Sequence, residues 1–567
     1  MSASNMSRFA AVALALTLWW PTIVLAGNPA RGAIASAHPL ATAAGREMLE
    51  QGGNAFDAAV AIGAALGVVE PAGSGLGGGG YWLLHRARDE FEVMIDARER
   101  APGAASADMY LDAKGDVIPR LSLDGPLAAA IPGTPAALVH ISAKYGRLPL
   151  AAALVPAIRL ARHGVPVTPR YRRLARWRLN AFAASPAAAR VFLNHGAVPE
   201  EGFVIHQPDL AIVLQRISEQ GRNGFYSGST ARQLVAGVRQ AGGIWSLDDL
   251  STYKVVERAP ITGRYRGLRI TSASLPSSGG MVLMQILNIL GPYQLEKLSR
   301  VERTHLIVEA MRRAYRDRAR YLGDPDFINV DVDKLLSDEY TAALRRTIDP
   351  ERATPSNPAD VVAAGDSGDQ TTHFSVFDSE GNRVAATLTI NSAFGSGFVP
   401  PGTGVLLNNE MDDFVAKPGV ANLYGLVGAE ANAIAPGKRP LSSMTPTFLE
   451  SDDRVVVLGT PGGSRIITMV LLVALEVTAR RGGPEDWVAL SRFHHQFLPD
   501  VIQIEPGAID GADIIALRAM GHRVEQRNRR YGNMQIVTWD KALNRSDAAS
   551  DPRGEGEVWV KPKKQAR

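Results

Sequence analysis

Thr371 is the residue of this chain whose type and place could do the most chemistry. It stands where a polar segment runs directly into the alternating, strand-like sequence Thr372–Val376. A cut before Thr371 would give it a free α-amino group that can take the proton of its own hydroxyl, so one residue would supply both nucleophile and base. The same residues could also begin an ordinary β-branched strand. Thr371 therefore predicts either a self-cutting enzyme or a simple strand start.

The segments around this threonine suit a cut followed by a hairpin. Residues 354–370 are rich in Pro, Gly, Ser, Asp and Ala, a composition typical of an exposed linker that can adopt a strained turn. Alternating patterns predict two strands, at 371–378 and 383–390, joined by a short turn. Depending on the register, the second strand would bring Thr389 or Asn391 close to the start of the first.

Two glycine-rich segments have different implications. Residues 73–80 match the GxGxxG pattern, but a helix is expected before them and a strand after them, the reverse of the order that binds dinucleotides. Nucleotide binding is therefore rejected. Residues 459–464 lie between a short apolar strand and an apolar helix, an order that aims backbone N–H groups at an anion. Two such donors could hold an oxyanion, although a purely structural turn has the same sequence character.

The composition indicates a large globular protein. The 567 residues are 46% hydrophobic and carry a net charge of +4, with no basic run long enough to predict nucleic-acid binding. The arginines of 170–178 fit a solvated helix face better than a nucleic-acid or membrane-surface patch. The chain has no cysteine, which excludes disulfides and thiol catalysis. No HExxH spacing is present either, so neither a metal nor a cofactor is expected.

The N-terminus reads as an export signal. Arg8 precedes an apolar run, Phe9–Ala26, which ends in Val-Leu-Ala before Gly27. This pattern predicts a signal peptide over residues 1–26 that is removed on export to the periplasm or the medium. The alternative is a retained membrane anchor, because the run is about long enough to span a bilayer. Pro21 and the cleavage-like end favour removal.

Helical and strand-like patterns alternate through the rest of the chain, which predicts a mixed α/β fold. A long helix is expected at Val301–Leu322 with its Arg and Glu side chains on the outer surface. Asn54 is a natural N-cap for one of the shorter helices. The further segments expected to be helical are 39–49, 55–69, 465–479 and most of 140–250, and the further strands are 81–84, 92–96 and 454–458.

A series of ordered motifs runs through nearly all of the mature chain. The motifs are HPLAT (38–42), QGGNAFDAAV (51–60), the glycine run at 73–80, DARE (96–99), LDGPLAA (123–129), YLGDPDF (321–327), TTHFSV (371–376), LLNNEMDDF (406–414), KRPLSSMTPT (438–447) and GTPGGSRI (459–466). Together they resemble the γ-glutamyltranspeptidase family of N-terminal nucleophile hydrolases, over about Ser36 to about Pro552.

The resemblance implies a fold and a set of site residues. The implied fold is a four-layer αββα unit that cleaves itself between Gln370 and Thr371 into two intertwined subunits, residues 27–370 and residues 371–567. Thr371 would be the nucleophile. The other implied site residues are Thr389 beside its hydroxyl, Gly462 and Gly463 as oxyanion donors, Arg98, Ser442 and Ser443 for the donor's α-carboxylate, Asn391, Glu410 and Asp413 for its α-amino group, and Tyr424 on a lid.

The implied activity is transfer of a γ-glutamyl group from glutathione or a related donor to water, an amino acid or a peptide. A fork-shaped cation with hydroxyls suits a carboxylate, and carboxylates suit an ammonium. Two alternatives stay open: a glutaryl-type acylase acting on cephalosporins, which needs no ammonium pocket, and an exported binding protein that never splits. Position 410 is Glu where some bacterial members of the family carry Gln, a departure that concerns the ammonium contact.

Overall fold

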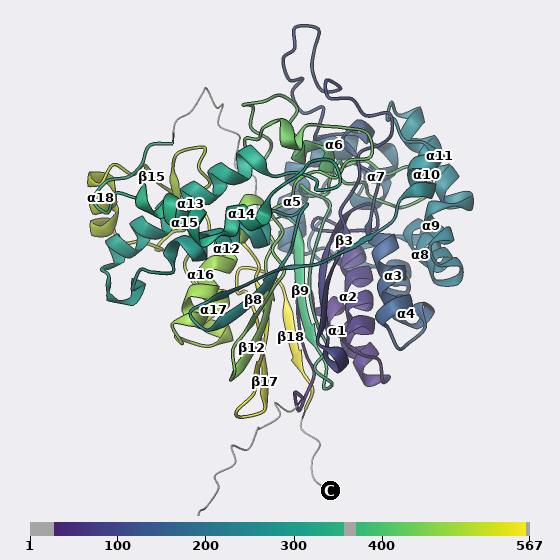
Figure 1. Ribbon diagram of the computed structural model, residues 1–567. Helices are drawn as coiled ribbons and strands as arrows, with labels where there is room; N and C mark the ends of the chain where they lie inside the picture. The colour runs from purple at the N-terminus through teal and green to yellow at the C-terminus, as the bar shows by residue number, and fades with distance from the viewer. Residues whose placement is uncertain (1–27, 357–369, 563–567) are drawn as a thin grey trace, which may run out of the picture.

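The computed structural model describes residues 28–356 and 370–562. Two antiparallel sheets lie face to face, and helices cover the outer face of each (Figure 1). The first sheet has the strand order β18-β1-β9-β10-β2-β3-β6, and the second has the order β17-β16-β12-β11-β8-β7. The predicted four-layer αββα arrangement is confirmed.

The element bounds are as follows. The first sheet contains β1 (Ala33–Ser36), β2 (Gly79–Arg86), β3 (Phe91–Ala97), β6 (Val256–Arg258), β9 (Thr372–Phe377), β10 (Arg383–Thr389) and β18 (Glu557–Val560). The second contains β7 (Ile261–Tyr265), β8 (Leu268–Ser272), β11 (Thr447–Glu450), β12 (Arg454–Gly459), β16 (Gln535–Asp540) and β17 (Arg545–Ser550). Two small sheets contain β4 (Val165–Pro166), β5 (Val204–Ile205), β13 (Phe493–His494), β14 (Ile502–Ile504) and β15 (Val524–Gln526).

The helices fall into two groups along the chain. Those beside the first sheet and its surroundings are α1 (Pro39–Glu50), α2 (Ala55–Val69), α3 (Thr134–Tyr145), α4 (Leu150–His163), α5 (Pro169–Trp177), α6 (Leu179–Ala183), α7 (Pro186–Phe192), α8 (Pro208–Gln220), α9 (Asn223–Tyr226), α10 (Gly228–Gln240) and α11 (Leu247–Thr252). Those beside the second are α12 (Gly279–Leu290), α13 (Arg300–Tyr321), α14 (Val332–Leu336), α15 (Asp338–Arg346), α16 (Ile466–Thr478), α17 (Pro484–Ala489) and α18 (Gly511–Ala519).

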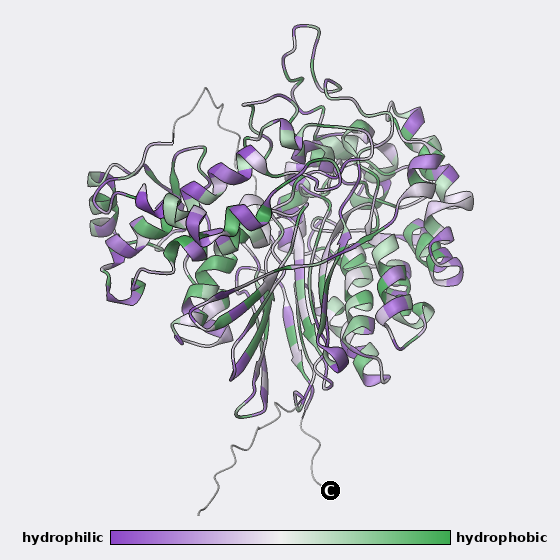
Figure 2. Ribbon diagram, viewed as in Figure 1, coloured by the Kyte–Doolittle hydropathy of each residue, from purple (hydrophilic) through white to green (hydrophobic). Residues whose placement is uncertain are grey.

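Helix α2 shows how the sequence builds the layers. Asn54 caps it as predicted, since its side chain accepts from the N–H of Asp57 at 3.0 Å while its own N–H donates to the Asp57 carboxylate at 2.8 Å. Every residue of α2 is buried, because the helix packs between the first sheet and the helices α1 and α4. Figure 2 shows apolar residues gathered where helices meet sheets and polar residues on the outer surfaces. Helix α2 ends immediately before Glu70 and so fixes the position of the glycine-rich loop that follows.

Both sheets contain strands from before and from after Gln370, and strands of the two origins pair with each other. In the first sheet, β1 lies between β18 and β9, and β10 pairs with β2. In the second, β11 pairs with β8. The two predicted subunits are therefore joined by sheet hydrogen bonds as well as by side-chain packing, and cutting one peptide bond would not separate them.

Some sequence predictions concern residues outside the described ranges. The predicted export signal lies there entirely, and so does most of the predicted linker at 354–370. Within 28–356 and 370–562, none of the helices has the length and apolarity needed to cross a membrane.

Candidate active site

The β9–β10 hairpin fixes the position of Thr371. Leu388 pairs with Thr372 across the two strands, so Thr389 comes to lie opposite Thr371, and the two hydroxyl oxygens are 3.0 Å apart. The N–H of Asn391 donates to the Thr389 hydroxyl oxygen at 2.8 Å. The Thr389 hydroxyl can then direct its own proton toward Thr371. The register that the sequence left open is thus the one that pairs the two threonines.

The backbone at Thr371 is strained. Its φ is +88°, a region that β-branched residues avoid and that costs about 1–3 kcal/mol. Gln370 and Thr371 are both buried, so the surrounding packing holds the strained peptide in place. The strain lies at the bond where self-cleavage is predicted.

The loop between β12 and α16 contributes to the same cavity as Thr371. Gly462 and Gly463 have φ values of +139° and +57°, in the left-handed region that favours glycine. A Cβ on Gly463 would lie 2.3 Å from the ring of Tyr424. Only glycine therefore allows Tyr424 to pack directly against this backbone.

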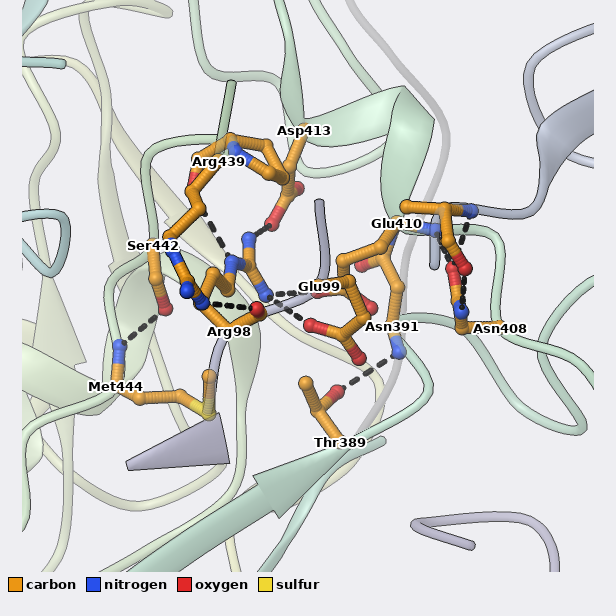
Figure 3. A network of polar contacts seen from close by, with 12 residues as sticks. Arg98, Glu99, Thr389, Asn391, Asn408, Glu410, Asp413, Arg439, Ser442 and Met444 are labelled. Atoms are coloured by element: carbon orange, nitrogen blue, oxygen red, sulfur yellow. Dashed lines mark hydrogen bonds and ion pairs between the residues drawn. The ribbon is translucent and has the colours of Figure 1, made fainter. Parts of the chain in front are cut away.

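A buried arginine collects three carboxylates beside the threonines. Arg98 follows β3 and is fully buried. Its guanidinium donates to Glu410 and, at 2.5 Å, to Asp413, which both belong to the 3₁₀ turn Glu410–Asp413 (Figure 3). Glu99 lies 3.6 Å from the same guanidinium. One cation therefore faces three acids in a site with little water.

The charge balance of this cluster favours bound protons. Burial raises the pKa of Glu410 well above its usual range against the opposing effect of Arg98. Burial likewise raises the pKa of Glu99 to about 7 and that of Asp413 in the same direction. Because buried carboxylates with too few cations hold protons, the cluster has capacity for one further positive group such as an ammonium.

Two serines and an arginine also line the cavity. The arginine, Arg318, belongs to the helix whose charged side chains were predicted to lie on the outer surface. Arg318 of α13 is buried and donates to Ser443 at 3.1 Å and to Ser278 at 2.9 Å. Burial lowers the pKa of Arg318 to about 10. The Ser442 hydroxyl accepts from the N–H of Met444 at 3.1 Å.

The prediction that α13 carries its Arg and Glu side chains on the outer surface was wrong for four of them, although Glu302 and Arg320 are exposed as predicted. Glu309, Arg312, Arg313 and Arg318 are all buried. The signal was present in the spacing, because residue 318 continues the stripe 307, 311 and 314, which is apolar in the sequence. An arginine in such a helical stripe points toward the core or a site.

Tyr424 lines the cavity from the segment that is predicted to be a lid. Its hydroxyl donates to the backbone oxygen of Asn391 at 2.8 Å. The adjoining lid residue Leu423 donates its N–H to Asp412 at 2.9 Å. The Asn391 side-chain nitrogen donates to the backbone oxygen of Asn409 at 2.9 Å, which leaves its amide oxygen as the atom able to accept from a ligand.

One cavity gathers nearly all of the residues singled out in the sequence. Gln370 and Gly462 are the two that do not line it. The residues that line it are Arg98, Arg318, Thr371, Thr389, Asn391, Glu410, Asp413, Tyr424, Leu426, Ser442, Ser443, Met444, Gly463, Ser464 and Ile466.

One group of possible metal ligands occurs among the described residues, and it consists of His305, Glu309 and His522. Glu309 already pairs with Arg312 and with Arg313, at 3.1 and 2.6 Å. The nearest nitrogens of His305 and His522 are 2.7 Å apart. Two cations and an existing His–His hydrogen bond make this group unsuited to a metal ion.

Glu99 makes stability depend on pH. Its pKa is raised to about 7 in the folded protein from the ordinary value of 4.5, so the stability linked to its proton is complete below about pH 4.5 and is lost as the pH rises through about 7. We expect thermal melts of the wild type to lose on the order of 2–3 kcal/mol between about pH 5 and about pH 8. Glu99→Gln should lose clearly less.

The exposed Glu201→Gln serves as the charge control for these melts, since residue 201 is fully on the surface. It should follow the wild-type pH dependence. Parallel curves for the wild type and Glu99→Gln would show that Glu99 is ionised throughout.

Comparisons with known proteins identify the family of this chain. The γ-glutamyltranspeptidase family model matches residues 41–560. A protein of Escherichia coli K12 named glutathione hydrolase proenzyme is 40% identical over 531 residues, covering 92% of this chain and 90% of its own length. Among solved structures, a cephalosporin acylase from Bacillus halodurans matches with a TM-score of 0.83 at 28% identity, covering 98% of each chain.

A γ-glutamyltranspeptidase from Helicobacter pylori is 42% identical, with a TM-score of 0.55 over 56% of this chain and 92% of the other. The family match spans both predicted subunits, and it includes every residue that lines the cavity. The chain belongs to the γ-glutamyltranspeptidase family.

Proposed function

We propose that this protein is a glutathione hydrolase and γ-glutamyltransferase that cleaves itself between Gln370 and Thr371. The observation that carries the proposal is the cavity in which the Thr371–Thr389 hydroxyl pair lies together with the Arg98 cluster. A nucleophile beside both a cation and buried acids suits an amino-acid donor that reacts at its side chain.

In self-cleavage the Thr371 hydroxyl attacks the carbonyl carbon of Gln370. The new C–O bond replaces the C–N bond, and the hydroxyl proton ends on the Thr371 nitrogen. Water then hydrolyses the ester, which leaves a carboxylate on Gln370 and a free amine and hydroxyl on Thr371. The backbone strain at Thr371 favours this step because it is relieved when the peptide bond breaks.

In the mature enzyme the free amine of Thr371 acts as the base for its own hydroxyl. The hydroxyl attacks the γ-amide carbon of the donor, and the N–H groups of Gly462 and Gly463 stabilise the oxyanion. The leaving amine takes the proton. Water, an amino acid or a peptide then takes the γ-glutamyl group from the ester.

The two ends of the donor's amino-acid head would meet opposite sides of the cavity. We place the α-carboxylate against Ser442 and Ser443 with the cations nearby, and the α-ammonium against Glu410 and Asp413. Charge-assisted hydrogen bonds of this kind contribute about twice as much as neutral ones. The Asn391 amide oxygen completes the ammonium contact.

The glutaryl-acylase alternative has support in the similarity to the Bacillus halodurans acylase. A glutaryl donor has no ammonium, so it gains nothing from Glu410 or Asp413. Their burial around Arg98 favours the γ-glutamyl donor, because these acids and Glu99 share one guanidinium and an ammonium would add a second positive partner.

Two nitroanilide donors separate these functions. The cleaved wild type should turn over γ-glutamyl-p-nitroanilide with a kcat/KM at least about tenfold higher than that for glutaryl-p-nitroanilide, since one charge-assisted contact to a carboxylate contributes about 1.5–3 kcal/mol. Asp413→Asn should lose most of this preference. Initial rates measured with and without the acceptor glycylglycine distinguish hydrolysis of the donor from transfer to the acceptor.

Asp412→Asn is the matched control, because Asp412 contacts Ser122 and Leu423 rather than Arg98. It should keep the preference for the γ-glutamyl donor. A wild type that prefers the glutaryl donor would instead support the acylase, and a wild type that turns over neither would support the binding protein.

The proposal includes export and a heterodimer of residues 27–370 and 371–567. The apolar run Phe9–Ala26 supports a signal peptide, and the interleaved sheets support retention of both pieces after the cut. N-terminal sequencing of the larger fragment from an exporting host should begin at Gly27.

A further inference from the structure

Glu70 lies against the same loop glycine, Gly73, as the backbone carbonyl of Thr371. It follows the last residue of α2, and its side chain is 9% exposed. A Cβ built on Gly73 would lie 3.2 Å from the backbone oxygen of Thr371 and 3.2 Å from the carboxyl carbon of Glu70. The glycine thus lets the Glu70 carboxyl and the Thr371 carbonyl approach from two sides. Glu70 does not line the donor cavity.

Several buried polar atoms around this peptide have no hydrogen-bond partner among the described residues. They are the Oε2 atom of Glu70, the hydroxyls of Ser74 and Thr372, and the side-chain oxygen of Gln370. Folded proteins satisfy the large majority of such atoms. Their concentration beside one strained peptide indicates a site adapted to a reaction rather than to stability.

Burial of the Glu70 carboxyl favours its neutral form, whereas the nearest charge, Arg170, opposes it. Burial raises the pKa of Glu70. The shift is opposed by Arg170, which lies 3.2 Å from the Oε1 atom of Glu70, and by the nearby Thr372 hydroxyl. Glu555 adds a further raising effect. An ionised carboxylate can only accept hydrogen bonds, and the Thr371 carbonyl can likewise only accept them. Only a protonated Glu70 can therefore donate toward this peptide.

We propose that Glu70 is a positioning residue for self-cleavage. Its carboxyl holds the Thr371 carbonyl and the Thr372 hydroxyl by hydrogen bonds. These contacts keep the strained Gln370–Thr371 peptide bond aligned with the attacking hydroxyl of Thr371. The inference rests on the self-cleavage proposed above and adds a group outside the donor cavity. Glu70 forms and breaks no covalent bond in the reaction. It acts by keeping Thr371 in its strained conformation until the peptide breaks.

Pulse-labelled precursor tests this role. The wild type, Glu70→Gln and Glu70→Ala are made in a cell-free translation mixture, shifted to buffers from about pH 5 to about pH 9, and followed on denaturing gels. Glu70→Gln keeps the donor group without the charge, so the ratio of its cleavage rate to that of the wild type should rise with pH as Glu70 ionises. Glu70→Ala should cleave at least about tenfold more slowly at low pH, equivalent to about 1.4 kcal/mol.

Turnover per cleaved molecule gives an independent readout. It should match the wild type in both variants, because Glu70 does not line the donor cavity. A pH-independent ratio for Glu70→Gln would overturn the inference even if Glu70→Ala fails to fold, and so would wild-type cleavage in Glu70→Ala. Glu201→Gln should cleave like the wild type. A wild type that stays whole would overturn self-cleavage itself, whereas a wild type that splits but turns over no γ-glutamyl donor would overturn only the proposed activity.

Discussion

Thr371→Ala should remain a single chain and should have no measurable γ-glutamyl turnover. The alanine lacks the hydroxyl that attacks Gln370 in the precursor and the donor in the mature enzyme. On a denaturing gel the wild type should give fragments of about 37 and about 21 kDa, scaled by length from the whole chain. N-terminal sequencing of the smaller fragment should read Thr-Thr-His-Phe.

Thr371→Ser is the matched control because it keeps the hydroxyl and removes only a methyl group. It should still split and still turn over donor, at reduced rates. If Thr371→Ala split at the same bond, the cut would come from another protease or another residue, and the nucleophile would have to be sought elsewhere.

Arg98→Gln should lose both donor binding and stability. Its loss leaves the buried acids Glu99, Glu410 and Asp413 without their shared cation, and breaking a buried ion pair from one side costs about 3–5 kcal/mol. We expect kcat/KM for γ-glutamyl-p-nitroanilide to fall at least about a thousandfold, which corresponds to about 4 kcal/mol. Donor kinetics and thermal melts of the same preparation measure the two effects.

Arg492→Gln separates the two effects. Arg492 is also buried and paired with a carboxylate, that of Asp551, and it does not line the donor cavity. This variant should melt at a lower temperature and keep the wild-type KM for the donor. A similar KM in Arg98→Gln and the wild type would remove Arg98 from the proposed binding site.

Local patterns predicted the elements that carry the nucleophile. The cap at Asn54, the helix at 55–69 and the β9–β10 hairpin all follow from short-range rules on capping, periodicity and turns. The family resemblance then placed the site residues by motif. Their roles stay predictions, as do the subunit boundaries and the export signal.

The sequence did not predict which distant residues come together in the folded protein. Arg318 was read as a surface residue because arginines are mostly exposed, and its place in an apolar stripe was outweighed by the many charges of the same helix. Glu70 lies some three hundred positions before Thr371 in the chain, and no local pattern connects the two. Only the packing of α2 against β9 brings them to the same place.

The position of β1 also sets when the protein can become active. This strand is the first one among the described residues, yet one of its neighbours, β18, is the last one among them. Such a high contact order delays folding until nearly the whole polypeptide has been made. A chain that lacks its final residues leaves β1 with an open edge beside the strand that carries Thr371. We therefore expect the first sheet to close, and self-cleavage to follow, only after the chain has been synthesised through β18.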